Sequence, residues 1–231
     1  MFTVRRGMSQ LGGAATPTVA GQVFGYVAAS VVSASEGQGL PPLFLDLDGV
    51  LADFNNGLLS LTGRDFTAWS AAKGKMWKAI ANAPEPGFFA TLEWHPGGND
   101  LWDFSLAHGP TIITGMPYGG WAEPQKRLWC SRELGASVPV ITCMAPEKSV
   151  RAAERLRERF GHGPALWPCP PASAGLPLRG AVLVDDTADV ARAPWERDGG
   201  IFIHHTDVKL TIARLRELGY GIASGTSPGT T

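Results

Sequence analysis

The sequence has few cysteines, and none of their spacings points to a structural role. There are three of them, Cys130, Cys143 and Cys169, with no CxxC pair and no Cys/His ligand pattern. An odd number without such spacing argues against a disulfide framework or structural zinc and favours a reducing compartment. The GxSxG, Walker A and GxGxxG sequences are also missing. The chain therefore lacks the local signatures of serine hydrolases, P-loop proteins and dinucleotide-binding proteins.

Neither sign of charge dominates, and no apolar run is long enough to span a bilayer. Twenty basic and twenty-one acidic residues give a formal net charge of -1, so no overall field attracts nucleic acid or anionic lipid. The apolar stretch from Val19 to Ala34 is broken by Gly21, Gln22 and Gly25, and a bilayer crossing needs about 20 mostly apolar residues. We expect no nucleic-acid polymer as a partner and no stable membrane insertion.

The two ends of the chain differ in composition from its middle. No acidic residue occurs between Arg6 and Glu36. We expect residues 1–40 to be a flexible extension, with an organelle presequence or a cleaved secretory signal as alternatives. The predicted location is the cytoplasm, or the mitochondrion or plastid if residues 1–40 are a presequence. From Ser224 onward only Gly, Ser, Thr and Pro occur, which predicts a disordered tail over residues 223–231.

Between these ends, short apolar runs alternate with amphipathic stretches. This alternation is typical of a parallel sheet covered by helices on both faces, and it predicts a three-layer, Rossmann-like α/β fold. Helical periodicity favours helices over Arg151–Phe160 and Thr206–Gly219. The runs expected to be strands are Leu43–Leu47, Thr111–Thr114, Ala181–Val184 and Ile201–His204, with a weaker candidate at Val138–Thr142.

The span from 54 to 109 interrupts the alternation and is rich in aromatic residues. It reads as a small helical cap inserted after the first strand, which leaves residues 41–53 and 110–222 for the core. Its large aromatic side chains are Trp69, Trp77, Phe88, Phe89, Trp94 and Trp102, together with Phe54 at its start. The chain thus divides into one core domain with one insertion.

Two acidic pairs follow two of the expected strands. Asp46 and Asp48 end the first apolar run, and Asp185 and Asp186 end the run from Ala181 to Val184. Because the carboxyl ends of parallel strands meet at one edge of a sheet, we expect four carboxylates to cluster there. A helix cap would explain one such pair, but two pairs favour a bound cation that offsets their repulsion. Mg²⁺ suits an all-oxygen site of this kind.

Donors suited to phosphate occur at the same predicted edge. Thr114 and Gly115 end another apolar run, and the backbone N–H of a glycine can approach an anion closely. Lys148 follows Pro146 at the expected start of a helix, where a cation is unfavourable unless an anion lies nearby. Lys126 remains the alternative phosphate lysine.

These residues together resemble the haloacid dehalogenase-like (HAD) superfamily. The segment DLDGVLADF from Asp46 to Phe54 is similar to the first motif of its 5'(3')-deoxyribonucleotidase branch, and FFATLEWHPG from Phe88 to Gly97 resembles that branch's return to the core. The resemblance covers roughly Leu43 to Gly219. It implies a magnesium-dependent phosphatase that forms an aspartyl-phosphate.

The resemblance also implies roles for the residues of the motifs. Asp46 would be the nucleophile, Asp48 the acid and base, and Lys148 the cation that neutralises nucleophile and phosphate. Thr114 and Gly115 would bind the phosphoryl oxygens. The implied metal site consists of Asp46, Asp48 through its backbone carbonyl, Asp185 and Asp186, and which of the last two binds Mg²⁺ directly stays open.

The sequence indicates less about the leaving group of the substrate than about the type of reaction. Phe54 and Trp77 are candidates for substrate binding, as facing walls of a slot for a base. We expect a small phosphomonoester as substrate, in the first place a nucleoside monophosphate, with sugar phosphates and other small phosphomonoesters as the alternative. A non-catalytic metal-binding module is a second alternative. The oligomeric state stays open, with a homodimer as one option.

Overall fold

The computed structural model describes residues 39–162, 167, 171–173 and 175–221. In this part of the chain, five parallel strands form one sheet in the order β3-β2-β1-β4-β5. β1 is shorter than predicted because the chain turns after Leu45, where Leu47 O accepts hydrogen bonds from Leu51 N and Ala52 N. The strands are β1 (Leu43–Leu45), β2 (Thr111–Gly115), β3 (Val140–Cys143), β4 (Val182–Asp185) and β5 (Ile201–His204).

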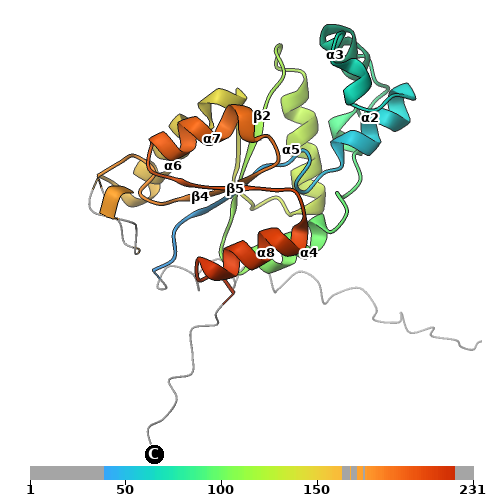
Figure 1. Cartoon of the computed structure of the whole chain (residues 1–231). Helices are drawn as coiled ribbons and strands as arrows, with labels where there is room; N and C mark the ends of the chain where they lie inside the picture. Colours follow the sequence, from blue (N-terminus) through green and yellow to red (C-terminus); the bar gives the residue numbers. More distant parts are fainter. Residues whose placement is uncertain (1–38, 163–166, 168–170, 174, 222–231) are drawn as a thin grey trace, which may run out of the picture.

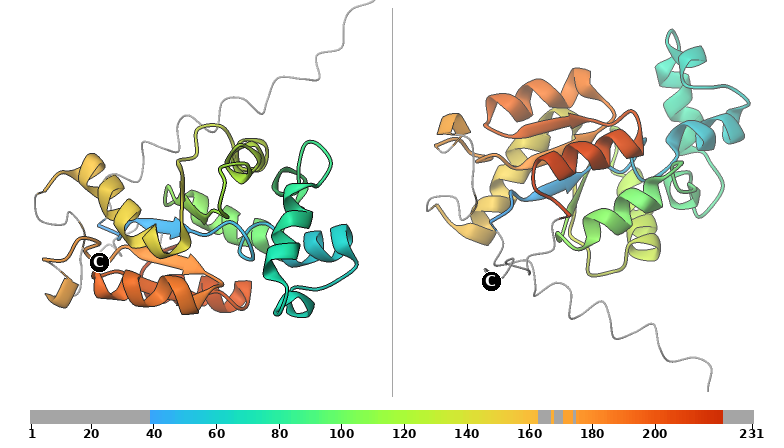
Figure 2. Two further views of the ribbon diagram at one scale, coloured as in Figure 1. Left: turned by 90° about the horizontal axis from the view of Figure 1, so that it is seen from above. Right: turned by 60° about the horizontal axis from the view of Figure 1, so that its bottom comes forward.

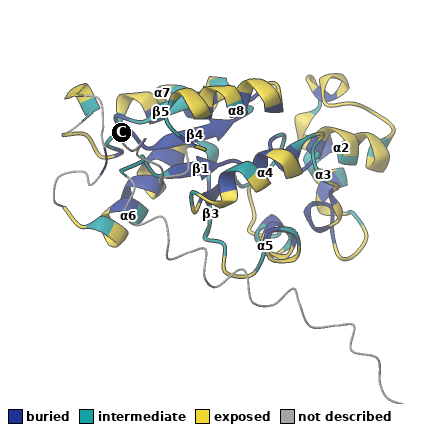
Figure 3. Ribbon diagram, turned by 90° about the horizontal axis from the view of Figure 1, so that it is seen from below, coloured by how far each residue is buried: buried dark blue, intermediate teal, exposed yellow. Residues whose placement is uncertain are grey.

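Helices cover both faces of the sheet, because alternate strand residues point to opposite sides. On one face Leu43 and Leu45 pack with α4 (Gly98–Leu106), α5 (Ala122–Glu133) and α8 (Val208–Glu217). On the other, Phe44 packs with α6 (Lys148–Phe160) and α7 (Ala188–Arg197), and its ring centroid lies 5.4 Å from that of Trp195. Figures 1 and 3 show the sheet between these layers. The three-layer α/β fold predicted from the sequence is confirmed.

The segment after β1 forms the helical part that stands apart from the sheet (Figures 1 and 2). It contains α2 (Phe54–Thr62), η1 (Thr67–Trp69) and α3 (Lys73–Ala81), whereas η2 (Phe89–Thr91), which follows them, packs against α5. The chain leaves and re-enters the core at one place, where Asp53 N donates to Glu93 O at 2.9 Å and His95 N to Leu51 O at 2.7 Å. α4, the last helix of the span 54–109, lies against α8 on the sheet.

Local signals account for the helix ends. Asp53 begins α2 by accepting a hydrogen bond from Asn56 N at 3.0 Å, and Gly63 ends it with a φ of 68°. Asp207 caps α8 in the same way through Leu210 N. α6 begins at Lys148, three residues earlier than predicted, because a 3₁₀ turn, η3 (Ala145–Glu147), with Pro146 in its first turn leads directly into it.

Of the predicted N-terminal extension, residues 1–40, only Gly39 and Leu40 belong to the described residues; the rest of it lies outside them, as do the predicted tail 223–231 and Cys169. None of the helices in the described ranges combines the length and the apolar composition that a bilayer crossing requires.

Candidate active site

The predicted acidic pairs lie at the centre of the sheet's carboxyl edge. β1 and β4 are neighbours, and Asp46 N donates to Val184 O at 2.9 Å, so Asp46 and Asp185 leave adjacent strands side by side. The strand order reverses here, because β2 and β3 lie on one side of β1 while β4 and β5 lie on the other. Ligands of open α/β sheets bind at such a reversal.

A tight turn after β1 places Asp48 and packs against the second acidic pair. Gly49 adopts a φ of 73°, a backbone conformation that glycine reaches without strain. A Cβ atom at Gly49 would also overlap the carboxylate of Asp186. The turn therefore requires glycine for two independent reasons, its φ and its contact with Asp186.

Three of the four carboxylates form a cluster. Asp46, Asp185 and Asp186 each offer an oxygen within 4.8 Å of the others. Burial, followed by the negative charge of Asp46, raises the pKa of Asp185 to about 6. Burial and the charges of Asp46 and Asp185 raise the pKa of Asp186 to about 7. A divalent cation with oxygen ligands would relieve this repulsion, so the donor set fits a hard metal ion.

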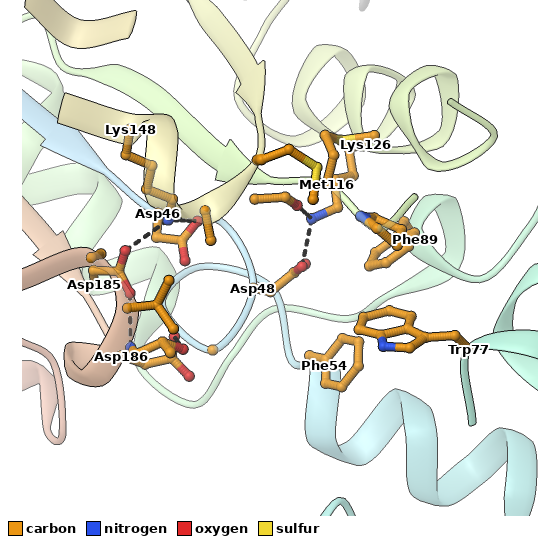
Figure 4. A pocket seen from close by; sticks show the side chains of 18 of the residues that line it. Asp46, Asp48, Phe54, Trp77, Phe89, Met116, Lys126, Lys148, Asp185 and Asp186 are labelled. Atoms are coloured by element: carbon orange, nitrogen blue, oxygen red, sulfur yellow. Dashed lines mark hydrogen bonds and ion pairs between the residues drawn. The ribbon is translucent and has the colours of Figure 1, made fainter. Parts of the chain in front are cut away.

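Lys148, the first residue of α6, contacts two of these carboxylates (Figure 4). Its Nζ lies 2.7 Å from Asp185 Oδ2 and 2.9 Å from Asp46 Oδ1, and its side chain is 3% exposed. Burial alone would lower the pKa of this ammonium. The charges of Asp46 and Asp185 outweigh burial and raise the pKa above its ordinary value. Lys148 is therefore a permanent cation beside Asp46.

Lys126 lies in the same site, on the opposite side of the turn that carries Asp48 (Figure 4). Its Nζ donates to Asp48 Oδ2 at 2.5 Å, to Thr114 Oγ1 at 2.9 Å and to Gly115 O at 2.7 Å. The ammonium also lies 4.5 Å from the ring centroid of Phe89. The sequence presented Lys148 and Lys126 as alternatives, whereas the structure brings both to the site.

A signal for the burial of Lys126 was present in the sequence. Lys126 follows Ala122 by four residues and precedes Trp129 and Cys130 by three and four, so it belongs to the buried stripe of α5. Lysine is seldom fully buried without a partner, and a lysine on an apolar stripe predicts an acidic group facing it.

The Asp48 carboxylate lies against Lys126 and outside the cluster of three. Burial raises the pKa of Asp48, the charge of Lys126 opposes this, and the charge of Asp46 adds to it, with a net shift above the ordinary value. About 23% of the side chain is exposed, and Asp48 lines a cavity. A carboxyl group with a raised pKa at a cavity can serve as a proton donor.

A cavity of about 530 Å³ opens over these residues. We call its charged side, which consists of Asp46, Asp48, Lys126, Lys148, Asp185 and Asp186, the floor. A second part of the lining, which we call the aromatic wall, consists of Phe54, Phe66, Trp77, Phe89, Tyr118 and Trp121. Phe54, Phe66 and Trp77 come from the segment after β1, and Tyr118 and Trp121 from the loop after β2.

The wall differs from the slot expected between Phe54 and Trp77. The two rings lie against each other, with centroids 6.0 Å apart and planes tilted by 51°, which leaves no space for a base between them. Both still line the cavity. Phe66, Tyr118 and Trp121 were not predicted from the sequence to line the site. The MPYGGW segment after Gly115 gave a signal, because two aromatic residues flank two glycines there.

Comparison with known proteins gives distant structural likenesses only. No protein-family model and no curated protein sequence matches the chain. A hydrolase from Streptococcus pneumoniae TIGR4 is 13% identical, with 78% of this chain and 100% of that chain covered and a TM-score of 0.43. A structure described as a putative haloacid dehalogenase-like hydrolase from Burkholderia xenovorans LB400 is 15% identical, with 71% and 81% covered and a TM-score of 0.41.

A third structure, a hydrolase of the haloacid dehalogenase-like family from Streptococcus pneumoniae, is 14% identical, with 77% of this chain and 99% of that chain covered and a TM-score of 0.44. At such identities a likeness says nothing about substrate. The chemistry of the site must therefore follow from its own residues.

Proposed function

We propose that this protein is a magnesium-dependent phosphomonoester hydrolase of the HAD type, which forms an aspartyl-phosphate on Asp46. The observation that carries the proposal is that two neighbouring aspartates have different surroundings. Asp46 lies with Lys148 and the second acidic pair, and Asp48 lies two residues away with Lys126. Two neighbouring carboxyl groups that have different partners are typical of a nucleophile and its acid/base partner.

The contacts of Asp46 suit a nucleophile. Its Oδ1 accepts a hydrogen bond from Leu47 N at 2.8 Å and faces Lys148 Nζ at 2.9 Å. Its Oδ2 has no hydrogen-bond partner among the described residues. In the proposed reaction Oδ2 attacks phosphorus, and the bond from phosphorus to the leaving oxygen breaks.

Asp48 would move the protons of both steps. In its protonated form, which its raised pKa favours, it donates a proton to the leaving oxygen. It then accepts a proton from the water that attacks phosphorus, which releases phosphate and restores the Asp46 carboxylate. One residue thus serves as acid in the first step and as base in the second.

Lys148, Thr114 and Gly115 would hold the phosphoryl group. Lys148 donates to Asp185 and faces Asp46, so one of its three N–H bonds is left for a phosphoryl oxygen. The Thr114 hydroxyl and the Gly115 amide supply further donors at the end of β2. A magnesium ion held by Asp46, Asp185, Asp186 and the Asp48 backbone carbonyl would supply positive charge to the phosphoryl oxygens.

The aromatic wall supports a nucleoside monophosphate as substrate. Its side chains offer aromatic faces and few hydrogen-bonding groups, a surface suited to a flat base rather than to the hydroxyls of a sugar. A base would lie on the outer face of Trp77, because Phe54 is buried and surrounded by other aromatic rings.

Phosphate release from a panel of deoxy- and ribonucleoside monophosphates and sugar phosphates, with and without magnesium, tests the proposal. Wild type should release phosphate from nucleotides in the presence of Mg²⁺, and Asp46→Asn should not. A clear preference for sugar phosphates would keep the chemistry and change the substrate. Inactivity on every substrate would favour a non-catalytic metal-binding module.

A further inference from the structure

Lys126 is a buried cation to which the proposed reaction assigns no role. It is fully buried in the interior, at 0% exposure, between α5, the end of β2 and the turn that carries Asp48. Burying an ammonium group is costly unless hydrogen bonds to acceptors replace its water. Packing alone would be served by an apolar side chain of similar length, such as methionine.

All three N–H bonds of Lys126 are in use. An ammonium group has three donors and no acceptor, and the three acceptors are Asp48 Oδ2, Thr114 Oγ1 and Gly115 O, at 2.5, 2.9 and 2.7 Å. No donor is left for a phosphoryl oxygen. Lys126 therefore differs from Lys148, whose contacts leave one donor available.

Two of these acceptors belong to residues of the proposed reaction. Lys126 is the one hydrogen-bond partner of the Asp48 side chain among the described residues, because Asp48 Oδ1 has none. Thr114 Oγ1, which is buried, gives a lone pair to Lys126, so this contact does not use its hydroxyl hydrogen. One ammonium thus fixes the directions of two groups at once.

We propose that Lys126 is a positioning residue that fixes the orientations of the Asp48 carboxyl group and the Thr114 hydroxyl without touching the substrate. This inference rests on the proposed phosphatase function. Its consequence concerns the leaving group, because a proton donor matters most where the departing oxygen is strongly basic. Alkyl phosphomonoesters, which include nucleoside 5'-monophosphates, need a proton from Asp48, whereas nitrophenolate departs readily without one.

The experiment compares wild type with Lys126→Met on an alkyl phosphomonoester and on 4-nitrophenyl phosphate, with Mg²⁺ present. We expect kcat/KM for the alkyl ester to fall on the order of 100-fold and that for the nitrophenyl ester roughly tenfold or less. The variant should also release a burst of nitrophenolate before a slower steady state, because a misplaced Asp48 activates water poorly and the phosphoenzyme accumulates.

Two further variants make the comparison decisive. Lys126→Gln keeps two amide donors and should give a smaller loss in the same sense, and it serves if Lys126→Met does not fold. Trp129→Phe is the matched control, because Trp129 is buried on the same helix and its Nε1 donates to Leu92 O at 2.8 Å, away from Asp48. It should lower the thermal midpoint and leave the ratio between the two substrates unchanged.

Equal losses on both substrates without a burst would overturn the positioning role, since a structural defect reduces both rates alike. This result is distinguishable from failure of the proposed function. If wild type is active, only the role of Lys126 fails. If wild type hydrolyses neither ester, the phosphatase proposal fails and the role of Lys126 fails with it.

Discussion

The floor and the aromatic wall of the cavity are built by different means. The floor comes from the ends of β1 and β4 and from two lysines of α5 and α6, and its side chains are fixed by hydrogen bonds and ion pairs, such as those of Lys148 with Asp46 and Asp185. The wall comes from a helical segment and a loop, and its rings are held by contacts with one another, such as Phe54 with Trp77 and Phe66. Directional contacts fix positions closely, whereas ring packing tolerates rearrangement.

This difference predicts a division of roles. Changes in the floor should affect the rate of the chemical step and the binding of metal. Changes in the wall should affect which leaving group is accepted. Substitutions on the two sides can test this division.

Asp46→Asn should lower kcat by at least about 1,000-fold, because an amide oxygen is a poor nucleophile toward phosphorus. The fold should survive. The substitution removes one of three clustered negative charges, so without magnesium the thermal midpoint should stay equal or rise. Steady-state phosphate release and a thermal unfolding curve measure the two effects. A variant that keeps a tenth of the wild-type rate would exclude Asp46 as the nucleophile.

Gly49→Ala should lower activity on the order of 100-fold and weaken the response to Mg²⁺. A Cβ atom there would overlap Asp186 and shift a proposed metal ligand. Gly63→Ala is a close control, because Gly63 has a similar φ of 68° with nothing within 4 Å of the added Cβ. Both variants should lose about 1 kcal/mol of stability to the left-handed backbone. A magnesium titration of activity should separate them.

Magnesium should raise the thermal midpoint more at pH 8 than at pH 5.5. The folded-state pKa values of Asp185 and Asp186, about 6 and about 7, lie above the ordinary value of 3.8. The folded state therefore binds protons more readily than the unfolded state, so without metal the two groups destabilise the fold above about pH 7. This destabilisation fades as the pH falls toward 4.

Metal binding relieves the same repulsion, and Mg²⁺ competes with protons for the same oxygens. The gain in thermal midpoint from Mg²⁺ should therefore be larger at the higher pH. Thermal unfolding at the two pH values, with and without Mg²⁺, measures the difference, and Asp186→Asn should reduce it. An equal gain at both pH values would argue against a metal site at this cluster.

Trp77→Leu should have the smallest effect and act on the wall alone. Loss of one aromatic face should raise KM for a nucleoside monophosphate roughly three- to tenfold, since such contacts contribute about 0.5–1.5 kcal/mol. The value of kcat should change little. Trp94→Leu is the control, because Trp94 packs against Trp129 in the core, with ring centroids 5.2 Å apart. A fall in kcat with an unchanged KM would show that Trp77 affects the chemical step, and it would contradict the division between floor and wall.

The sheet was predictable from the sequence because its strands are nearly continuous apolar runs that end in polar residues. All five expected strands occur, and the edge where the acidic pairs meet follows from parallel pairing alone. The proximity of the two acidic pairs was predictable from the sequence, because Asp46 directly follows one central strand and Asp185 ends another.

The contacts across the cavity were not predictable in the same way. The partners of Lys126 lie 11, 12 and 78 residues away in the chain, and a charge on a helix is in general more often solvated than buried. The contact between Phe54 and Trp77 depends on the angle between α2 and α3, which no local pattern encodes. Phe66, whose place in the wall depends on its contact with Phe54, was not predicted for the same reason.

The narrow crossing between the core and the helical segment gives that segment the character of an exchangeable module. Ala52 pairs with Trp94 in an antiparallel bridge, and Asp53 N donates to Glu93 O beside it, so the two ends of the inserted chain lie next to each other. A piece of chain whose ends meet can be replaced by another of different length without moving the residues to which it is joined. Gene segments encoding new insertions at this junction would therefore give descendants with other substrates and an unaltered catalytic machinery.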